Sequence, residues 1–344
     1  MGKDNTYTGA LIGAGRIGML LEKDPKRLKP ATHFGMMNSH PKINFTAVCD
    51  TSEENLKIAK QMNQNIETYS DAVTMLNEIK PDIVSIATWK DTHYEMMRAC
   101  VDADIPVIIC EKPIAEKFED ALEIVKEIEN SGKHLIINHR RRFDSLLYPV
   151  IDEIKSGRIG EIIQVSAFYV FGLVTTGTHL IDALRFFLKD VAGEMVWASG
   201  FENKFKHHAP PDDPCIDGFI GFENGLKVSL QSMNIQDYDI FNVSFYGRKG
   251  MIQFKNIGRD FNYYDVIPSK EHDGFTELSD DPTKKIGGEP RNQFTYMLDN
   301  AINCIEGNAK SLSTGRDSLK ALQVLLALQE SVRENGKVIS IPNI

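Results

Sequence analysis

Short apolar runs alternate with segments of helical periodicity through the first 140 residues of the chain. The expected strands are rich in β-branched residues and cover 8–14, 43–50, 82–88, 106–110 and 134–138. The expected helices have apolar residues every three or four positions and cover 16–23, 53–62, 72–79, 92–101 and 118–130. Strands that alternate with helices in units of about 25–30 residues are typical of βαβ crossovers. The pattern therefore predicts a doubly wound parallel sheet.

The rest of the chain has a different pattern, in which longer runs alternate apolar and polar positions. These runs predict strands over 161–169, 194–201, 216–222, 225–233, 239–246 and 251–255. Helices are expected over 145–155, 178–188, 292–305 and 318–335. Consecutive strands separated by turn residues favour an antiparallel sheet with one open face. We expect an α/β domain over 1–140, followed over 141–344 by an α+β domain with a large, open, mostly antiparallel sheet.

A glycine-rich loop joins the first expected strand to the first expected helix. The loop has the G-x-G-x-x-G spacing and reads Gly13-Ala14-Gly15-Arg16-Ile17-Gly18. In this motif the first glycine permits a tight turn, the second lets the backbone approach a pyrophosphate, and the third allows close helix–strand packing. N–H groups at the helix start then face the phosphates. We expect the loop, including Arg16 and Ile17, to bind a dinucleotide; the alternative is a purely structural glycine turn.

Asp50 ends the second expected strand. A carboxylate at this place accepts hydrogen bonds from the adenosine ribose and repels a 2′-phosphate, so NAD is favoured over NADP. Asp50 follows Gly18 by 32 residues, whereas about 20 is usual. The stretch 23–42 therefore resembles an insertion after the first helix.

The composition narrows the class of protein and its partners. The chain has 344 residues, a net charge of −9 and a 25% charged fraction. A nucleic-acid surface needs a basic face, so nucleic acid is not an expected partner. The apolar runs are far shorter than the roughly 20 residues that span a bilayer, and the first five residues do not resemble a signal peptide. Five scattered cysteines without metal-ligand spacing favour reduced thiols, a cytoplasmic location and no metal site.

Two further stretches follow expected strands of the first domain. Parallel strands of this kind carry ligands beyond their carboxyl ends. Glu111-Lys112-Pro113 follows the strand 106–110, and Lys112 beside a nicotinamide would take a hydroxyl proton while hydride leaves the same carbon. The alternative is a surface lysine before a helix. Thr88 and His93 follow the strand 82–88, where His93 is either a neighbour of the cofactor or simply a residue of the helix N-terminus.

In the second domain, His179 lies at the start of an expected amphipathic helix. It is either a functional histidine or a structural residue beside an apolar face, since Leu180 and Leu184 follow it at core spacing. Adjacent histidines at 207 and 208, followed by Asp212 and Asp213, lack the spacing of a chelating site and favour a solvated loop.

These stretches together resemble the glucose–fructose oxidoreductase/inositol dehydrogenase/MocA family of NAD(P)-dependent dehydrogenases. The motifs that carry the resemblance occur in order as Gly13-x-Gly15-x-x-Gly18, Thr88 with His93, Cys110-Glu111-Lys112-Pro113 and Gly177-x-His179-x-x-Asp182. The resemblance covers nearly the whole chain. It implies a Rossmann domain and a sheet domain whose flat face forms a homodimer or homotetramer. It also implies that Lys112 and His179 are active-site residues and that Arg141 lies near the substrate.

One position departs from the family pattern. The family often has Asp four residues before the histidine, and here that residue is Thr175. A hydroxyl cannot act as a charged base or orient His179 as a carboxylate does. The departure weakens an assignment as a polyol dehydrogenase of the inositol type, whereas relatives that act on nucleotide sugars also vary here. Trp89, where many relatives have Pro, is a smaller departure.

Three consecutive arginines lie at the expected domain junction. Arg140, Arg141 and Arg142 would supply a bidentate clamp for a phosphate or carboxylate of the substrate, and the alternative is salt bridging within the junction. In an extended segment, Arg140 and Arg142 would point one way and Arg141 the other.

The favoured function is an NAD-dependent oxidoreductase that transfers hydride between nicotinamide and a secondary alcohol or ketone of a nucleotide-linked or phosphorylated sugar. Lys112 would take the hydroxyl proton, and His179 with Thr175 and Arg141 would contact the substrate. One alternative is an inositol-type cyclitol or free-sugar dehydrogenase. Another is a regulator that binds NAD and a sugar without catalysis. A third treats the open sheet as a surface for a different protein.

Overall fold

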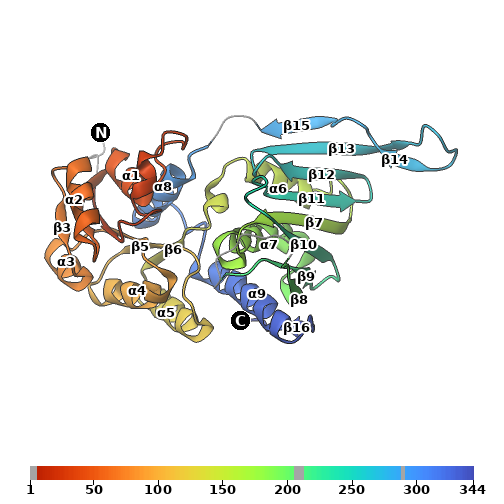
Figure 1. Ribbon diagram of the computed structural model, residues 1–344. Helices are drawn as coiled ribbons and strands as arrows, with labels where there is room; N and C mark the ends of the chain where they lie inside the picture. Colours follow the sequence, from red (N-terminus) through yellow and green to blue (C-terminus); the bar gives the residue numbers. More distant parts are fainter. Residues whose placement is uncertain (1–5, 205–212, 288–290) are drawn as a thin grey trace. The chain divides into compact units, whose positions relative to one another are not determined.

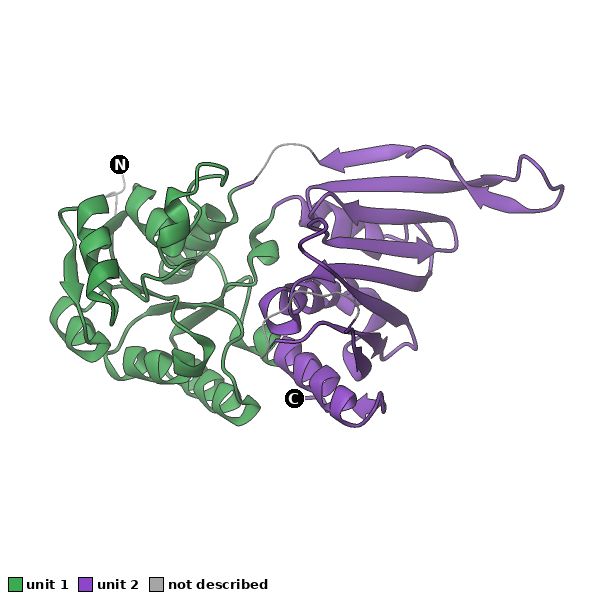
Figure 2. Ribbon diagram, viewed as in Figure 1, with its two compact units in different colours: residues 1–144, 292–319 green, residues 145–291, 320–344 purple. Residues whose placement is uncertain are grey.

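The structure, a computed structural model, describes residues 6–204, 213–287 and 291–344 (Figure 1). The chain divides into two compact units, which are described separately (Figure 2). Unit 1 comprises residues 1–144 and 292–319, and unit 2 comprises residues 145–291 and 320–344. A segment near the C-terminus is therefore part of the first unit.

Unit 1 is built on a six-stranded sheet in which every neighbouring pair of strands is parallel. The spatial order is β3-β2-β1-β4-β5-β6. The strands β2 and β3 are thus added on one side of β1, and β4, β5 and β6 on the other. The strands are β1 (Tyr7–Ile12), β2 (Ile43–Cys49), β3 (Glu67–Tyr69), β4 (Ile83–Ile86), β5 (Val107–Cys110) and β6 (His134–Ile137). This arrangement confirms the predicted doubly wound sheet, to which the structure adds the short strand β3.

Helices cover the sheet of unit 1, and every residue of β4 and β5 is buried. The helices are α1 (His33–Ser39), α2 (Glu53–Met62), α3 (Ala72–Ile79), α4 (His93–Asp102), α5 (Phe118–Asn130) and α8 (Gln293–Ile305). The C-terminal helix α8 packs on α1, β5 and β6, with Phe294, Met297 and Leu298 in the same core as Leu11 and Ile109. Residues nearly 300 positions apart thus complete the first core.

The predicted first helix over 16–23 is replaced by an interrupted one. Residues 16–19 form a turn, and a 3₁₀ helix, η1 (Leu20–Lys23), follows it. The chain then makes an excursion and returns at α1, where the backbone N–H of Phe34 donates to the carbonyl of Gly18 at 2.7 Å. Residues 19–32 therefore separate Gly18 from α1. The inserted stretch is not 23–42, as predicted, and it interrupts the first helix of the unit instead of following it. Glu22 closes this excursion by accepting hydrogen bonds from Ala31 N–H and the Thr32 hydroxyl.

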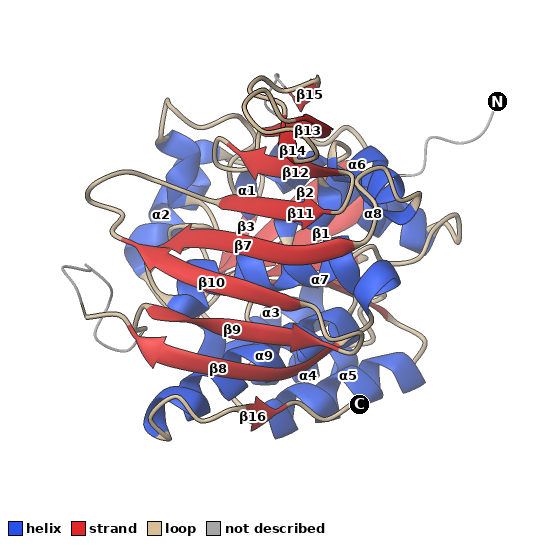
Figure 3. Cartoon of the chain, turned by 90° about the vertical axis from the view of Figure 1, so that its right-hand side faces the viewer, coloured by secondary structure: helices blue, strands red, loops and turns tan. Residues whose placement is uncertain are grey.

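Unit 2 is built on a ten-stranded sheet (Figure 3). Its order is β14-β13-β12-β11-β7-β10-β9-β8-β16, with β15 paired to β13. The pair β7–β10 is parallel and the other pairs are antiparallel, as the pattern of alternating runs predicted. The strands are β7 (Ile162–Val170), β8 (Met195–Glu202), β9 (Ile216–Phe222), β10 (Lys227–Met233), β11 (Asn242–Gly247), β12 (Gly250–Lys255), β13 (Asp260–Pro268), β14 (Thr276–Leu278), β15 (Lys284–Gly287) and β16 (Ile339–Ser340).

Among the described residues of unit 2, helices pack against one face of this sheet and leave the other uncovered (Figure 3). The helices are α6 (Leu147–Lys155), α7 (Thr178–Ala192) and α9 (Gly315–Arg333), of which α9 begins in residues assigned to unit 1. Phe187 of α7 contacts Phe245, Phe254 and Phe261 edge to face. The opposite face carries apolar side chains too, including Phe201 and Phe219, which are 55% and 47% exposed. The helical layer therefore buries only one of the two apolar faces.

Candidate functional site

The glycine loop follows β1, and its three glycines have different surroundings. Gly13 has a φ of +93°, and a Cβ there would lie 2.7 Å from the carbonyl carbon of Ala87. At Gly18 a Cβ would lie 2.0 Å from the carbonyl oxygen of Gly13. No heavy atom lies within 4 Å of a Cβ built at Gly15, so the approach to the backbone is open there. The turn and packing positions thus need glycine, and Gly15 leaves room for a ligand.

The N–H groups that follow this loop belong to an irregular turn rather than to a regular helix. Met19 and Leu20 both donate to the carbonyl of Gly15, at 2.8 and 3.0 Å. The expectation of a helix N-terminus at Arg16 is therefore wrong. Apolar residues at 17, 20 and 21 suggested a helix, but the carbonyl of Gly18 accepts the N–H of Phe34 in α1 instead. Arg16 is exposed and Ile17 is half-buried.

Asp50, at the end of β2, is held beside the glycine loop. Its Oδ2 accepts the Ala14 N–H at 2.6 Å, and its Oδ1 accepts the Ser52 N–H at 2.8 Å. Ser52 in turn caps α2 by accepting the Asn55 N–H at 3.3 Å. The loop and the helix therefore fix the carboxylate in one orientation, with its remaining lone pairs able to accept ribose hydroxyls.

Glu111, directly after β5, lies in a buried polar cluster. Its Oε1 is 2.8 Å from Nε2 of His33 and also accepts from Nδ2 of Asn138. The other ring nitrogen of His33 is 2.5 Å from the Ser85 hydroxyl. Burial acts to raise the pKa of the Glu111 carboxyl, but the hydrogen bonds from His33 and Asn138 and the electrostatic effects of His33 and Lys112 outweigh it and lower the pKa to about 2. The carboxylate is therefore ionised at neutral pH.

Lys112 is half-buried and follows this carboxylate in the chain. Its backbone N–H donates to Glu111 Oε2 at 3.3 Å. The peptide bond between Lys112 and Pro113 is cis. The positive charge of Lys112 is one of the causes that lower the pKa of Glu111.

His93 is the first residue of α4 and is buried between two loops. Its Nδ1 is 2.8 Å from the carbonyl oxygen of Pro113, and its Nε2 is 3.2 Å from that of Thr88. Burial lowers the pKa of His93 below its ordinary value, although both hydrogen bonds act to raise it. A neutral imidazole donates through one nitrogen, and the shorter contact assigns that proton to Nδ1. His93 therefore ties the loop after β5 to α4, next to Thr88.

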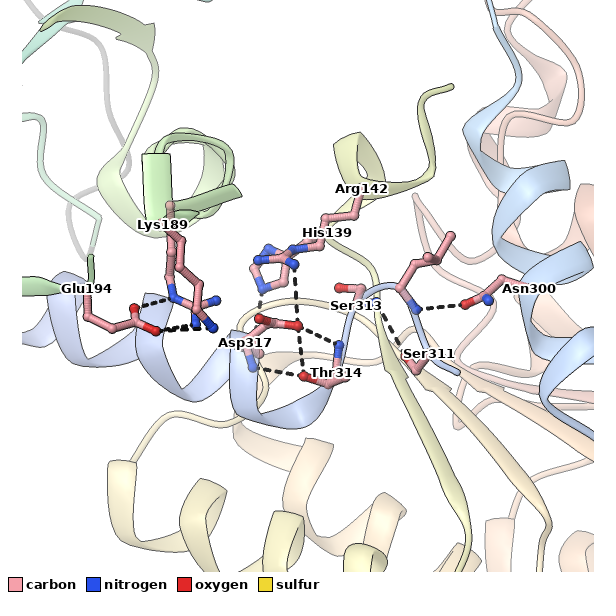
Figure 4. Close-up of polar contacts among 12 residues, drawn as sticks. His139, Arg142, Lys189, Glu194, Asn300, Ser311, Ser313, Thr314 and Asp317 are labelled. Carbon is pink, nitrogen blue, oxygen red and sulfur yellow. Dashed lines mark hydrogen bonds and ion pairs between the residues drawn. The ribbon is translucent and has the colours of Figure 1, made fainter. Parts of the chain in front are cut away.

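The three arginines lie on a short 3₁₀ helix, η3 (Arg140–Phe143). The predicted alternation of side chains is wrong, because a helix with three residues per turn points consecutive side chains in three directions. Arg142 pairs with Asp317 of α9 at 3.3 Å (Figure 4), and Asp317 also accepts from the backbone and hydroxyl of Thr314. The structure thus bears out the salt-bridge reading for Arg142. Arg141 is buried and Arg140 is half-buried.

In unit 2, His179 is the second residue of α7 and is half-buried, between the buried Thr178 and Leu180. A π-helical turn, η4 (Leu173–Gly177), precedes α7 and contains the exposed Thr175. From the middle of α7, Arg185 makes two hydrogen bonds of 2.7 Å to Glu194, which also pairs with Lys189 one turn further along the helix (Figure 4). The helix that carries His179 is therefore anchored to the chain just before β8.

Asp213 holds the π-helical turn and was missed as a functional candidate. Its carboxylate accepts the backbone N–H groups of Val174 at 2.6 Å and Thr175 at 2.8 Å. A Cβ at Gly172 would lie 2.1 Å from the Asp213 carboxylate, so glycine is needed for this approach. The rest of the predicted solvated tract, at 207–212, lies outside the described residues. A glycine six residues before α7 was the available signal, but it did not indicate a partner about 40 residues away.

Other site residues missed from the sequence are His33, Ser85 and Asn138. His33 lies in the expected insertion, and Ser85 is the one polar residue of the otherwise apolar strand β4. Within the described part of the chain, no group of three His, Cys, Asp or Glu residues has a geometry that would hold a metal ion. The helices described there include none long and apolar enough to cross a membrane.

Two family models match the chain. One is described as "Oxidoreductase family, NAD-binding Rossmann fold" and matches residues 9–139. The other is described as "Oxidoreductase family, C-terminal alpha/beta domain" and matches residues 151–340.

Individual proteins are similar over the full length. D-glucoside 3-dehydrogenase of Escherichia coli is 26% identical, over 96% of each chain. D-apiose dehydrogenase of Paraburkholderia graminis is 27% identical, over 98% of this chain and 90% of its own. Among solved structures, the WlbA dehydrogenase from Bordetella pertussis, in complex with NADH and UDP-GlcNAcA, has a TM-score of 0.76 at 19% identity and covers 99% of this chain and 100% of its own. This last likeness is one of fold.

Proposed function

We propose that this chain, which belongs to the glucose–fructose oxidoreductase/inositol dehydrogenase/MocA family and is an NAD-binding oxidoreductase, acts on a nucleotide-linked or phosphorylated sugar. The observation that carries the catalytic part is the place of Lys112. It follows β5, beside the ionised Glu111, at the edge of the sheet that also bears the glycine loop and Asp50. Family and geometry together favour hydride transfer at a secondary alcohol.

The residues around the glycine loop fit a bound NAD. Gly15 leaves its backbone open, and Asp50 presents a fixed carboxylate. NAD, when bound, supplies the nicotinamide C4 that accepts or returns hydride. The residues that we propose to contact it are Gly13, Gly15, Arg16, Ile17, Gly18, Asp50, Thr88, His93, Glu111 and Lys112. Residues 1–140 are the dinucleotide-binding part in this proposal, and 141–344 the substrate-binding and oligomerisation part.

In the oxidation direction, the alcohol loses hydride from carbon and a proton from oxygen. Lys112 in its neutral form accepts that proton, and in the reduction direction Lys112 returns it to the carbonyl oxygen. His179 hydrogen-bonds to the reacting oxygen and orients it, while Thr175 and Arg141 contact other parts of the substrate. Thr175 carries no charge, so it contributes a hydrogen bond and no base.

The substrate class rests on the arginines and on Thr175. Arg142 is ion-paired with Asp317, so the proposed contact to a phosphate or carboxylate falls to Arg140 and Arg141. A bidentate guanidinium suits a planar or tetrahedral oxyanion. A fold neighbour whose structure contains UDP-GlcNAcA is in line with this class.

A second candidate is a free-sugar or cyclitol dehydrogenase. It is favoured by the full-length similarity to D-glucoside 3-dehydrogenase and D-apiose dehydrogenase, because neither name refers to a phosphorylated sugar. In that case, the arginines would serve the structure of unit 1 as Arg142 does.

Two further features are part of the proposal. The five cysteines are buried and unpaired, which favours a reducing compartment such as the cytoplasm. The outward face of the unit 2 sheet carries Phe201 and Phe219, and Trp197 lies against Gly221. An apolar face of this kind favours a homodimer or homotetramer through the sheet.

A substrate panel tests the proposed function. Purified protein is mixed with NAD or NADP and with uridine-diphosphate sugars, sugar phosphates, free sugars, glucosides or cyclitols, and reduced cofactor is measured by absorbance. We expect turnover with NAD and a phosphate-bearing sugar. Turnover confined to free sugars or cyclitols would establish the second candidate. Cofactor and sugar binding by calorimetry without any turnover would indicate the regulator instead.

A further inference from the structure

Four buried polar side chains form a chain of hydrogen bonds beneath the carboxyl edge of the unit 1 sheet. The order is Ser85, His33, Glu111 and Asn138, with Ser85 to His33 at 2.5 Å and His33 to Glu111 at 2.8 Å. The four residues are between 0 and 6% exposed. They come from β4, from α1 and from the chain directly after β5 and β6, so the cluster ties three parallel strands to the resumed helix.

The chemistry of the groups defines most of the hydrogen-bond directions. An ionised carboxylate only accepts, so Nε2 of His33 carries a proton whichever form the ring has. Nδ1 of His33 faces the Ser85 hydroxyl, which donates to a neutral ring and accepts from a charged one. The carboxamide of Asn138 supplies a second donor to the same oxygen of Glu111. The cluster therefore satisfies an ionised Glu111 in both protonation states of His33.

The interrupted helix delivers His33 to this place. Thr32 caps α1 by accepting the Gly35 N–H at 3.0 Å, and Glu22 holds the Thr32 hydroxyl at 2.7 Å. The imidazole also lies edge to face against Phe294 of α8, with 5.3 Å between the ring centroids. Three elements thus hold the ring, and both of its nitrogens have polar partners.

Glu111 connects the cluster to Lys112. The two residues are adjacent, the Lys112 N–H donates to Glu111 Oε2, and the positive charge of Lys112 helps to keep Glu111 ionised. A buried carboxylate with one donor removed would turn towards another cation. The cation of the next residue in the chain, which acts on the pKa of Glu111, is the amine to which we assign proton transfer.

We propose that His33 is a positioning residue for Lys112, which acts by holding the Glu111 carboxylate so that its charge and direction towards the amine stay constant. This inference rests on the proposed function of Lys112. The other ionisable groups near Glu111 are His93 of α4 and Cys110 of β5, and neither makes a hydrogen bond to its carboxylate among the described contacts.

The first test replaces His33 while keeping its volume or its donor. His33→Phe keeps a ring against Phe294 but removes both hydrogen bonds, and we expect kcat to fall about 100-fold, the cost of an ångström-scale misplacement. His33→Gln retains a donor to Glu111 and should recover at least a tenth of wild-type kcat. In His33→Phe, the Glu111 carboxylate is free to turn towards Lys112, and its negative charge would raise the pKa of the Lys112 amine. Because the neutral amine is the base, the oxidation rate should then rise at higher pH than in the wild type. The dissociation constant of NAD, measured by fluorescence, should change less than threefold.

His40→Gln is the matched control. His40 directly follows α1, is nearly buried, and lies 3.0 Å from a carboxylate, that of Asp299. We expect its kcat and pH profile to equal those of the wild type. If His33→Phe fails to fold by circular dichroism, Ser85→Ala tests the same chain from its far end and should shift the pH profile in the same direction.

The outcomes separate this inference from the function on which it rests. Wild-type kcat and pH profile in every folded His33 and Ser85 variant, with an inactive Lys112→Met, would overturn the positioning role alone. An active Lys112→Met would overturn the proposed function. A loss of kcat in His33→Phe with an unchanged pH profile and no recovery in His33→Gln would show that His33 serves folding only.

Discussion

Each unit holds one of the two residues proposed for catalysis, and it does so by different means. Around Lys112, the supporting contacts join side chains, and the central one is a buried charge on Glu111. Before His179, they join one side chain to the backbone, as Asp213 accepts two N–H groups of the π-helical turn. The first arrangement controls charge, whereas the second controls the path of the main chain. Substitutions in unit 1 should therefore change pH dependence, and substitutions near His179 should change rate and stability together.

The strongest test of this comparison is Lys112→Met. Methionine keeps most of the side-chain volume but cannot accept a proton, and proton transfer by a positioned group contributes about 10² to 10⁴-fold. We expect kcat to fall by that factor, with NAD binding retained in fluorescence titration. Near-normal turnover would contradict the assignment of Lys112.

The second test measures the charge of unit 1 directly. The pKa of Glu111 is lowered from 4.5 to about 2 in the folded protein, so it stabilises the fold fully above pH 4.5. That stabilisation, about 3 kcal/mol, should be lost as the pH falls from 4.5 towards 2. Urea unfolding of wild type and Glu111→Gln across this range should give two free-energy curves that converge at low pH. Curves that remain parallel would refute a stabilising ionised Glu111.

The third test applies to the backbone support in unit 2. Asp213→Ala leaves two N–H groups without their acceptor, and loss of such a cap costs about 0.5–2 kcal/mol. We expect a lower urea midpoint and a lower kcat, with the pH profile in its wild-type position. Asp213→Asn keeps one acceptor and should lie between Ala and wild type. A shifted pH profile in Asp213→Asn would show that this carboxylate acts through its charge, as Glu111 does.

The smallest effect on turnover is expected on the open face of the unit 2 sheet. Phe219→Asp places a charge among exposed apolar side chains, so it should dissociate an oligomer formed through that face. Light scattering should report the lower mass, and kcat per chain should stay within about twofold. Ser229 of β10 is the antiparallel partner of Phe219 on the same face, so Ser229→Asp should lower the mass in the same way. An unchanged mass in Phe219→Asp would exclude this face as the interface.

Much of the fold followed from local patterns. The helices at 53–62, 72–79 and 118–130 have the predicted bounds, because each has a continuous apolar stripe. The glycine loop and Asp50 were also found from spacing and strand context. The strand at 67–69 escaped prediction because three residues are too few to show a period, and the strands beyond 256 because they alternate weakly.

The misplaced helix and arginines show where local patterns fail. The sequence has a helical period over 16–23. However, the Glu22 carboxylate accepts hydrogen bonds from Ala31 and Thr32, and the chain leaves the helical path before it reaches α1. Likewise, side chains that alternate along Arg140 to Arg142 require an extended path, while packing of α8 on η3 accompanies a tight turn there. In both cases, a contact with a later segment overrode the local preference.

The sequence by itself determined the class of fold, the dinucleotide loop, the family and the two residues proposed for catalysis, since these depend on apolar period and on residues at fixed short spacing. Only the tertiary structure decided which side chains support them. His33 and Glu111 are 78 positions apart, and Asp213 and Thr175 are 38 apart. Contacts over such distances depend on how strands and helices pack, and no local period records them. The supporting side chains are therefore visible only once the chain has folded.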